Sequence, residues 1–358
     1  MSVRVALVGL GWAGRELWFP RLREHADFEV VAAVDPDPAV REAFRAATGV
    51  TAHPAVDALT PRAVDLAVVA VPNHLHVEVA GALLAGGITV FLEKPLCLTP
   101  AEVDVLAVAE RGGGTLLAGS AARYRADVRA LARTLPELGD VRHVDLAWVR
   151  ARGVPQAGGW FTRRDTAGGG ALLDLGWHLL DTLAYLLGPD RFAQVAGVTS
   201  DDFVNAAEWG AAWRRDRPAA GTADVEDTAR GFLVRDDGVS VSLRASWASH
   251  RARDVSVIRV EGSAGTAELR CTFGFSPNRH PEPALAVTRE GVTARPVLPA
   301  EEIGAEYRRQ LDDLVPMLAD PGHRGRAVAE ARPIVEMIES FYACAHSARA
   351  RRTVPAFQ

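Results

Sequence analysis

The chain has 358 residues, enough for two domains with a large buried core. Hydrophobic residues make up 48% of it and charged residues 24%, as in an ordinary globular protein, and the net charge of -5 provides no basic field for nucleic acid. No apolar run is long enough for a bilayer, and the three cysteines lack metal-ligand spacing, so we expect a cytoplasmic protein with reduced thiols and without metal, membrane or nucleic-acid partners.

Strands and helices alternate along the first third of the chain. Short apolar runs predict strands, and segments of helical periodicity lie between them. The strands are expected at Val3–Val8, Phe28–Val34, Val64–Val71, Ile88–Leu92 and Thr115–Ala118. The helices are expected at Ala13–Glu24, Val40–Ala47, His76–Ala85 and Thr99–Glu110, the last with Thr99 as its N-cap. This alternation is typical of a parallel, doubly wound α/β sheet.

A glycine loop follows the first of these strands directly and opens a helix. Gly9, Gly11 and Gly14 have the spacing that permits a tight turn and lets the backbone approach a pyrophosphate closely. The helix that begins at Ala13, after Trp12, then offers free N–H groups and a partial positive charge. The loop therefore predicts a dinucleotide site.

Asp35 ends the second strand, about 20 residues after the loop, where a carboxylate accepts hydrogen bonds from a ribose. Its negative charge would repel a 2′-phosphate, so we expect NAD rather than NADP. The alternative is that Asp35 only forms the turn before Pro36.

The triplet Glu93-Lys94-Pro95 follows another strand, which places Lys94 at the carboxyl edge of the sheet, where ligands bind in open α/β folds. A lysine there could polarise a substrate oxygen or lose a proton if partly desolvated. Alternatively it is a surface lysine. Pro95 keeps Lys94 extended and could follow a cis bond.

The second part of the chain has a different pattern. A turn at Leu138-Gly139 and the alternating run Val141–Val149 indicate a sheet with one exposed face. After a helix at Ala171–Leu187, further strands are expected at Ala229–Val234, Val239–Trp247, Val255–Glu261 and Thr266–Arg270, and helices at Glu301–Ala319 and Arg326–Ala350. We predict a largely antiparallel open sheet, with Asp201–Asp224 as a long irregular loop.

Asp174 and His178 are four residues apart on the helix predicted after the triple glycine Gly168-Gly169-Gly170, and hence share a face. The aspartate can orient the imidazole, which titrates near neutrality and can carry a proton. Such pairs are often structural, but a glycine loop before the helix would let the backbone approach a ligand. Asp181 is interpreted as a structural partner.

Taken together, these motifs resemble those of the Gfo/Idh/MocA family, which includes glucose-fructose oxidoreductase and inositol dehydrogenase. The matching segments extend over nearly the whole chain. They are the glycine loop, Val71-Pro72-Asn73-His74-Leu75-His76, Glu93-Lys94-Pro95 and Gly168–His178, with weaker matches at Val225-Glu226-Asp227, Ser246-Trp247 and Glu261–Thr266.

The resemblance implies a Rossmann domain (residues 1–122) and a C-terminal α/β domain (123–358) whose open sheet forms a dimer or tetramer, with C-terminal helices able to pack on the first domain. It implies a cofactor cleft formed by Gly9, Gly11, Trp12, Ala13, Gly14, Asp35, Val71, Pro72, Asn73, His76, Glu93 and Lys94. Lys94, Asp174 and His178 are then the catalytic residues, and the histidine is the general base.

The chain also departs from the family pattern. After the last Rossmann strand it reads Gly119-Ser120-Ala121-Ala122-Arg123-Tyr124, without the family's usual asparagine and phenylalanine, although Arg123 and Tyr124 fit a common pattern. The indoles of Trp160, Trp177 and Trp209 could form an apolar platform for a sugar or belong to the core. The expected substrate-binding residues are Lys94, Arg123, Tyr124, Trp160, Asp174, Trp177 and His178.

We therefore expect an NAD(H)-dependent oxidoreductase that transfers a hydride to or from a secondary alcohol of a sugar, amino sugar or cyclitol. Two alternatives remain: a glycosidase or lyase that oxidises its substrate transiently, and a non-catalytic nucleotide-sensing regulator of the same fold. The substrate could be an inositol, a free hexose, a nucleotide sugar or an aminoglycoside-type sugar.

Overall fold

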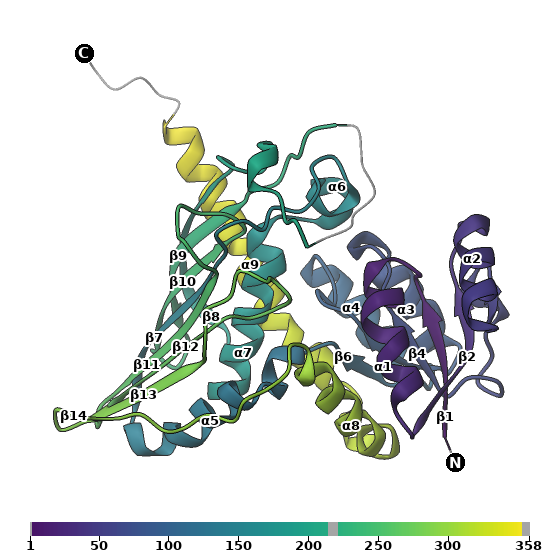
Figure 1. Ribbon diagram of the computed structural model, residues 1–358, viewed down its shortest axis with the longest axis horizontal. Helices are drawn as coiled ribbons and strands as arrows, with labels where there is room; N and C mark the ends of the chain where they lie inside the picture. The colour runs from purple at the N-terminus through teal and green to yellow at the C-terminus, as the bar shows by residue number, and fades with distance from the viewer. Residues whose placement is uncertain (1, 214–220, 353–358) are drawn as a thin grey trace. The chain divides into compact units, whose positions relative to one another are not determined.

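The computed structural model describes residues 2–213 and 221–352, which form two compact units. Unit 1 comprises Met1–Ala121 and Tyr307–Arg332, and unit 2 comprises Ala122–Glu306 and Pro333–Gln358. The chain thus returns to unit 1 for one helical stretch before it ends in unit 2 (Figure 1). Among the described helices, none is both long enough and apolar enough to cross a membrane.

Unit 1 is built on a six-stranded parallel sheet in the order β3-β2-β1-β4-β5-β6. Its strands are β1 (Val3–Val8), β2 (Phe28–Val34), β3 (Thr51–His53), β4 (Leu66–Val69), β5 (Thr89–Leu92) and β6 (Leu116–Ala118). Its helices are α1 (Phe19–Glu24), α2 (Pro38–Thr48), α3 (His76–Ala85), α4 (Pro100–Glu110) and most of α8 (Ala305–Ala319). The strand order is that of a Rossmann fold, which confirms the predicted fold class.

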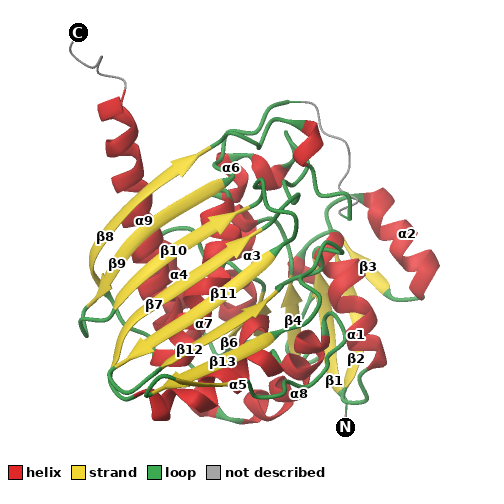
Figure 2. Cartoon of the chain, turned by 60° about the vertical axis from the view of Figure 1, so that its left-hand side comes forward, coloured by secondary structure: helices red, strands yellow, loops and turns green. Residues whose placement is uncertain are grey.

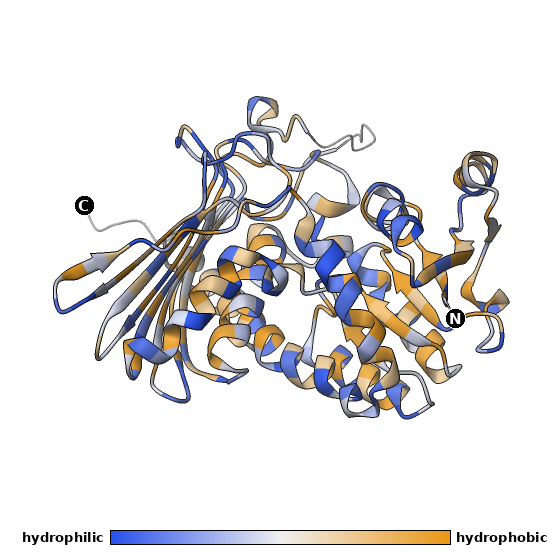
Figure 3. Ribbon diagram, turned by 60° about the horizontal axis from the view of Figure 1, so that its bottom comes forward, coloured by the Kyte–Doolittle hydropathy of each residue, from blue (hydrophilic) through white to orange (hydrophobic). Residues whose placement is uncertain are grey.

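The strands of unit 1 are apolar because both faces of the sheet are covered. All four residues of β4 are buried, and Figure 3 shows these strands in the orange of hydrophobic residues. Helix starts are set by local hydrogen bonds. Thr99 caps α4 by accepting a hydrogen bond from the Glu102 amide at 3.3 Å, as expected.

Unit 2 contains an eight-stranded sheet in the order β14-β13-β12-β11-β7-β10-β9-β8. Its strands are β7 (Val141–Val149), β8 (Phe192–Ser200), β9 (Thr228–Arg235), β10 (Ser240–Ser246), β11 (Val255–Gly262), β12 (Thr266–Cys271), β13 (Ala284–Arg289) and β14 (Val292–Ala294). Its helices are α5 (Ala126–Thr134), α6 (Arg164–Ala167), α7 (Trp177–Leu187) and most of α9 (Arg326–Arg352). All neighbouring strands are antiparallel except β7 and β10, which run parallel.

The helices of unit 2 lie on one face of this sheet, and the face towards the viewer in Figure 2 carries none of the unit's described helices. On the covered face, the Phe341 ring of α9 packs where a Cβ at Gly197 of β8 or Gly231 of β9 would stand. On the uncovered face, Val198 and Phe232 are 46% and 49% exposed. The sheet is therefore one-sided, as its alternating sequence predicts.

Several elements of unit 2 are missing from the sequence prediction. Helix α5 is one of them, although its sequence contains good helix formers such as alanine, leucine and arginine. Strands β8, β13 and β14 lie at the two margins of the sheet, where exposed positions weaken the apolar signal. The described part of Asp201–Asp224 is irregular apart from a short 3₁₀ turn at Ala207–Trp209, as expected; residues 214–220 lie outside the described chain.

Candidate active site

The space around each glycine of the loop shows which of them must be glycine for packing reasons. Gly9 has φ +91°, and a Cβ there would stand 2.6 Å from the Ala70 carbonyl oxygen, while a Cβ on Gly14 would overlap the Gly9 carbonyl. Around Gly11, in contrast, no atom lies within 4 Å of a Cβ position. Packing therefore explains two of the glycines, and the open space at Gly11 leaves the backbone accessible, so the loop fits a dinucleotide pyrophosphate.

The helix after the loop begins with a π-helical turn, Ala13–Trp18, which continues into α1. π-turns are rare and occur frequently at functional sites. Its last residue, Trp18, is buried and donates its indole N–H to Glu93 Oε1 at 2.8 Å. The first helix of the cofactor loop is thereby tied to the Glu93-Lys94-Pro95 segment.

Asp35 lies where the sequence places it, at the end of β2 beside the glycine loop. Its carboxylate accepts the Leu10 N–H at 2.9 Å and the Asp37 N–H at 2.9 Å, one on each oxygen. Each carboxylate oxygen can accept a further bond, so the group can still receive ribose hydroxyls. Arg41 donates to the carbonyl oxygens of Asp35 and Pro36 at 2.8 and 2.9 Å, which places a cation near this carboxylate that sequence reasoning missed.

Replacing Asp35 with serine is expected to narrow any preference for NAD over NADP, because the variant loses the charge that repels a 2′-phosphate and keeps Arg41 beside it. The measurement is the ratio of kcat/KM for the two cofactors. Asp37→Ser, two residues away, is the control for a general change in surface charge. An unchanged ratio in Asp35→Ser would count against the ribose role.

His76 joins two segments of the expected cofactor cleft. Its Nδ1 lies 2.6 Å from the Pro95 carbonyl oxygen and its Nε2 lies 3.0 Å from that of Val71. The side chain is 1% exposed. Burial lowers the pKa of His76 to about 4, and the two carbonyls, which favour the charged ring, offset only part of this effect. We therefore interpret His76 as a brace between the two loops, whose neutral ring has one N–H and donates it to one of these two carbonyl oxygens. Its assignment as a direct cofactor ligand stays a prediction.

The brace predicts a pH dependence of stability. Because the pKa of His76 is about 4 in the folded chain and 6.5 ordinarily, the unfolded chain binds the proton more readily between these values. The free energy of unfolding should therefore fall as the pH drops from about 6.5 to about 4, by up to ~3 kcal/mol from this group. Urea unfolding of the wild type and His76→Gln at pH 7 and pH 4.5 measures the difference; equal losses in both proteins would contradict the prediction.

Glu93 and Lys94 follow β5 and join the other site segments of unit 1 at the carboxyl edge of the sheet. Glu93 accepts the Lys94 N–H at 3.1 Å in addition to the Trp18 indole, and burial raises the pKa of its carboxyl. The Lys94–Pro95 peptide bond is cis. Lys94 is also the only lysine of the chain: every other member of its 40 lysines and arginines is arginine. Lysine presents a compact ammonium group there, whereas arginine would present a larger, planar guanidinium.

Asp174 and His178 lie on one continuous helical stretch of unit 2. The expectation of a regular α-helix is corrected, because Leu172–Gly176 forms a π-helical turn before α7. Trp247 is fully buried and donates its indole N–H to Asp174 Oδ2 at 2.9 Å, and the Trp148 ring lies 5.5 Å from the His178 ring, centroid to centroid. Two strands thus hold the pair, Trp148 from β7 and Trp247 directly after β10.

The triple glycine before this helix has a different explanation from the expected one. A Cβ on Gly169 would overlap the Tyr342 hydroxyl, and one on Gly170 would overlap the Glu226 carbonyl oxygen. The Glu226 carboxylate accepts the N–H groups of Gly170 and Leu172 at 3.0 to 3.1 Å and the Tyr342 hydroxyl at 2.9 Å. The glycines therefore permit packing on a buried carboxylate, which caps the helix from outside its own sequence.

Asp227, the neighbour of Glu226, anchors the irregular loop instead. Its Oδ2 accepts the N–H groups of Phe203 and Val204 at 2.5 and 2.9 Å, and its backbone carbonyl accepts the Trp247 N–H at 2.8 Å. Desolvation raises the pKa of both acids, Glu226 and Asp227. The weak Val225-Glu226-Asp227 match was the available sequence signal for these roles.

Three of the expected substrate ligands, Arg123, Tyr124 and Trp177, are paired or buried within unit 2. Arg123 donates Nε and Nη2 to the Asp181 carboxylate at 2.5 to 3.1 Å, so it secures the start of unit 2 to α7, and Asp181 is its structural partner. Tyr124 is 8% exposed, with Arg129 over its ring at 5.0 Å. Trp177 is 3% exposed and belongs to the core, whereas Trp160 is 40% exposed.

The sequence-predicted residues thus form two sets. Gly9, Gly11, Gly14, Asp35, Val71, Pro72, Asn73, His76, Glu93 and Lys94 lie in unit 1, with Trp12, 40% exposed, and Ala13 at the start of its first helix. Asp174 and His178 lie in unit 2, with Trp148, Trp247 and Glu226, which sequence reasoning did not assign to the site.

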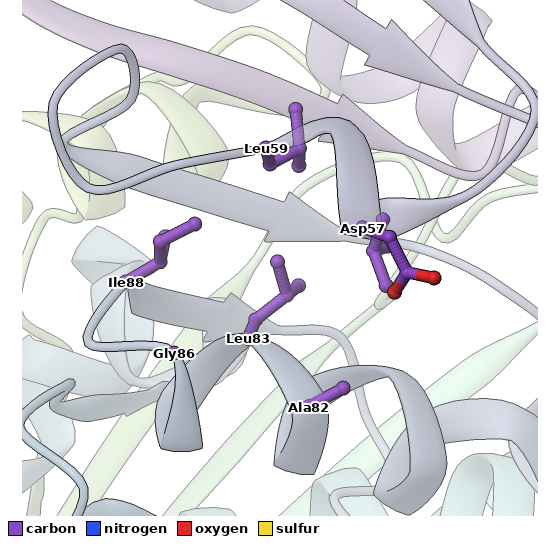
Figure 4. A pocket seen from close by; sticks show the side chains of 7 residues that line it. Asp57, Leu59, Ala82, Leu83, Gly86 and Ile88 are labelled. Atoms are coloured by element: carbon purple, nitrogen blue, oxygen red, sulfur yellow. The ribbon is translucent and has the colours of Figure 1, made fainter.

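A separate hollow of about 300 Å³ lies in unit 1, lined by Val56, Asp57, Leu59, Ala82, Leu83, Gly86 and Ile88 (Figure 4). Its lining is apolar apart from Asp57. It includes the C-terminal half of α3 and the start of β5, and so lies away from the carboxyl edge that carries the site segments. We assign it no role in the reaction.

Two family models match the chain, one in each unit. Residues 3–119 match the family described as "Oxidoreductase family, NAD-binding Rossmann fold", and residues 132–268 match the "GFO/IDH/MocA C-terminal domain". A protein of Amycolatopsis mediterranei, provisionally named UDP-kanosamine synthase oxidoreductase subunit, is 77% identical over 358 residues, 100% of both chains.

More distant relatives agree with this match. The dTDP-3,4-didehydro-2,6-dideoxy-alpha-D-glucose 3-reductase of Streptomyces antibioticus is 28% identical over 331 residues, 91% of this chain and 92% of that protein. The crystal structure of GenD2 from gentamicin A biosynthesis in complex with NAD is 25% identical and has a TM-score of 0.75, covering 97% of this chain and 95% of that one.

Proposed function

Because the chain belongs to the GFO/IDH/MocA family of NAD(P)-binding oxidoreductases, whose named relatives act on sugars and nucleotide sugars, we propose that it is an NAD(H)-dependent dehydrogenase for a secondary alcohol of a nucleotide-activated hexose. The observation that carries the proposed chemistry is the position of the only lysine. It follows Glu93 at the carboxyl end of β5, in the same unit as a glycine loop that fits a pyrophosphate.

The proposed reaction divides its work among three side chains. A bound nicotinamide dinucleotide supplies the hydride acceptor or donor. His178 takes the proton of the hydroxyl as the C–H bond breaks, and Lys94 stabilises the oxygen as it becomes a carbonyl. The Trp247 indole holds the Asp174 carboxylate in place, and the negative charge of that carboxylate favours the protonated imidazole. Oxidation removes one hydride and one proton from the carbinol and leaves a ketone.

NAD is the proposed cofactor. The Gly9–Gly14 loop and the helix after it would hold the pyrophosphate, and Asp35 would accept the ribose hydroxyls. The Asp35 carboxylate lies next to the loop and already accepts the Leu10 N–H, so it is positioned for this role. The NAD-bound relative supports the same cofactor.

The proposed substrate is a nucleoside diphosphate hexose, because the names of two relatives carry a UDP or a dTDP group. Kanosamine is glucose with an amine in place of the 3-hydroxyl. A UDP-kanosamine synthase therefore needs the 3-hydroxyl oxidised to a ketone before nitrogen can be introduced. We propose that this chain forms that ketone, and that a transaminating enzyme consumes it.

The uncovered face of the eight-stranded sheet is the proposed surface for a homodimer or homotetramer. Exposed Val198 and Phe232 on this face support it, since such side chains are costly in water. Size-exclusion chromatography with light scattering tests it, with Phe232→Glu expected to shift the protein towards the monomer.

The assay for the proposed function monitors the near-ultraviolet absorbance of reduced nicotinamide. UDP-glucose, dTDP-glucose and free glucose are each incubated with NAD⁺, and net reduced cofactor is expected with a nucleotide hexose. A glycosidase or lyase with transient oxidation would consume substrate without this accumulation. A regulator would bind cofactor and consume nothing, and either result would contradict the proposal.

A further inference from the structure

Two arginines follow β7 at the edge of the sheet where β10, its parallel neighbour, also ends (Figure 2). These residues, Arg150 and Arg152, are each held against a tryptophan. The Arg152 guanidinium lies 3.7 Å from the Trp209 ring centroid, and that of Arg150 lies 5.1 Å from Trp148 and 5.7 Å from Trp213. Stacking fixes a guanidinium plane, so less freedom is lost when it binds an anion.

Trp148 connects this cluster to the proposed general base. One neighbour of its ring is His178, at 5.5 Å between centroids, and another is Arg150. The same indole therefore contacts both the imidazole and a guanidinium. The Trp148 indole N–H is also buried and meets no acceptor among the described residues. A buried donor without an acceptor is rare in proteins, and an ordered water or a ligand is one way to satisfy it.

The local charge favours an anion. Arg152 is exposed, and its hydrogen bonds, to the Ala151 and Ser249 carbonyls at 2.9 and 3.4 Å, both use Nη1. The acidic groups on the adjoining segments are Asp254 and Glu208. Asp254 is fully buried and accepts the Ala151 N–H at 2.8 Å, and Glu208 is exposed beside Trp209. The Asp254 carboxylate therefore holds the arginine segment in place from beneath.

From this arrangement we infer that Arg150 and Arg152 bind the diphosphate of the nucleotide-activated sugar, with the hexose directed along Trp148 towards His178. This inference rests on the proposed function for its substrate class and adds the site that recognises it. Guanidinium groups pair with phosphate oxygens through two parallel N–H bonds, and two arginines suit the two phosphates. Trp209 and Trp213 orient the arginines, and the Trp148 N–H serves the sugar.

Binding of UDP to the NAD⁺-loaded full chain, measured by isothermal titration calorimetry, tests the site without turnover. Arg152→Gln and Arg150→Gln are each expected to weaken UDP binding by about 10- to 100-fold, the contribution of a charged hydrogen bond. Arg142→Gln is the matched control, because Arg142 lies at the opposite end of the same strand and pairs with Asp140. It should bind UDP as the wild type does. Circular dichroism checks the fold, and exposed Arg152 keeps the test valid if Arg150→Gln is unstable.

The outcomes separate this inference from the proposed function. Wild-type affinity for UDP in both glutamine variants, an equal loss in Arg142→Gln, or no UDP binding by the wild type would each overturn the site. If nucleotide hexoses are oxidised while both variants keep the wild-type KM, the dehydrogenase assignment holds and the site is wrong. If UDP binding depends on the two arginines and no sugar is oxidised, the site holds and the dehydrogenase assignment is wrong.

Discussion

Lys94→Ala is expected to slow turnover by about 10²- to 10⁴-fold, the usual contribution of a group that moves or stabilises a proton or a developing charge at the reacting oxygen. Lys94→Arg should not restore the rate. Arginine keeps the positive charge, but its guanidinium is larger, planar and does not lose its proton. The measurement is kcat and kcat/KM with the nucleotide hexose that the assay identifies.

The arginine variant is the discriminating control for this prediction. If charge alone mattered, Lys94→Arg would work, and the chain, which uses arginine at every other basic position, would have no reason for lysine here. Full activity in Lys94→Arg would reduce Lys94 to a general cation. Near-normal turnover in Lys94→Ala would remove it from the reaction altogether.

His178→Ala is expected to cause a loss of similar size, about 10²- to 10⁴-fold in kcat, because the hydroxyl proton would then have no base positioned to receive it. The acid limb of the pH–rate profile should disappear with it, since imidazole loses its proton near neutrality. His280→Ala is the matched control in unit 2, because His280 lies outside the strands and contacts the Glu282 carbonyl. An unchanged acid limb in His178→Ala would assign the proton to another group.

Much of unit 1 could be predicted from the sequence because its signals are local. The run Val3–Val8 and the glycines after it specify a strand, a turn and a helix within a dozen residues, and Asp35 follows at the spacing the fold requires. Each of these features depends on neighbours in the chain. Because the strands are parallel, their carboxyl ends lie at one edge of the sheet, however far apart they are in sequence.

The supports of Asp174 and His178 could not be found in this way. Trp247 is 73 residues from the aspartate that it holds, and Glu226 is 56 residues from the Gly170 N–H that it accepts. Such contacts depend on which strands become neighbours, which composition and periodicity leave open. The sequence alone therefore favours a ligand loop at the triple glycine, whereas its glycines make room for Glu226 and Tyr342.

Because the sequence contains a single ε-amine, this group can be observed selectively by spectroscopy. With isotope-labelled lysine incorporated, NMR would show one side-chain resonance, whose titration reports the protonation of that amine directly and without assignment. Amine-selective acylating reagents would mark only this position and the chain's first residue, so the rate of labelling with and without dinucleotide would measure shielding by the bound cofactor.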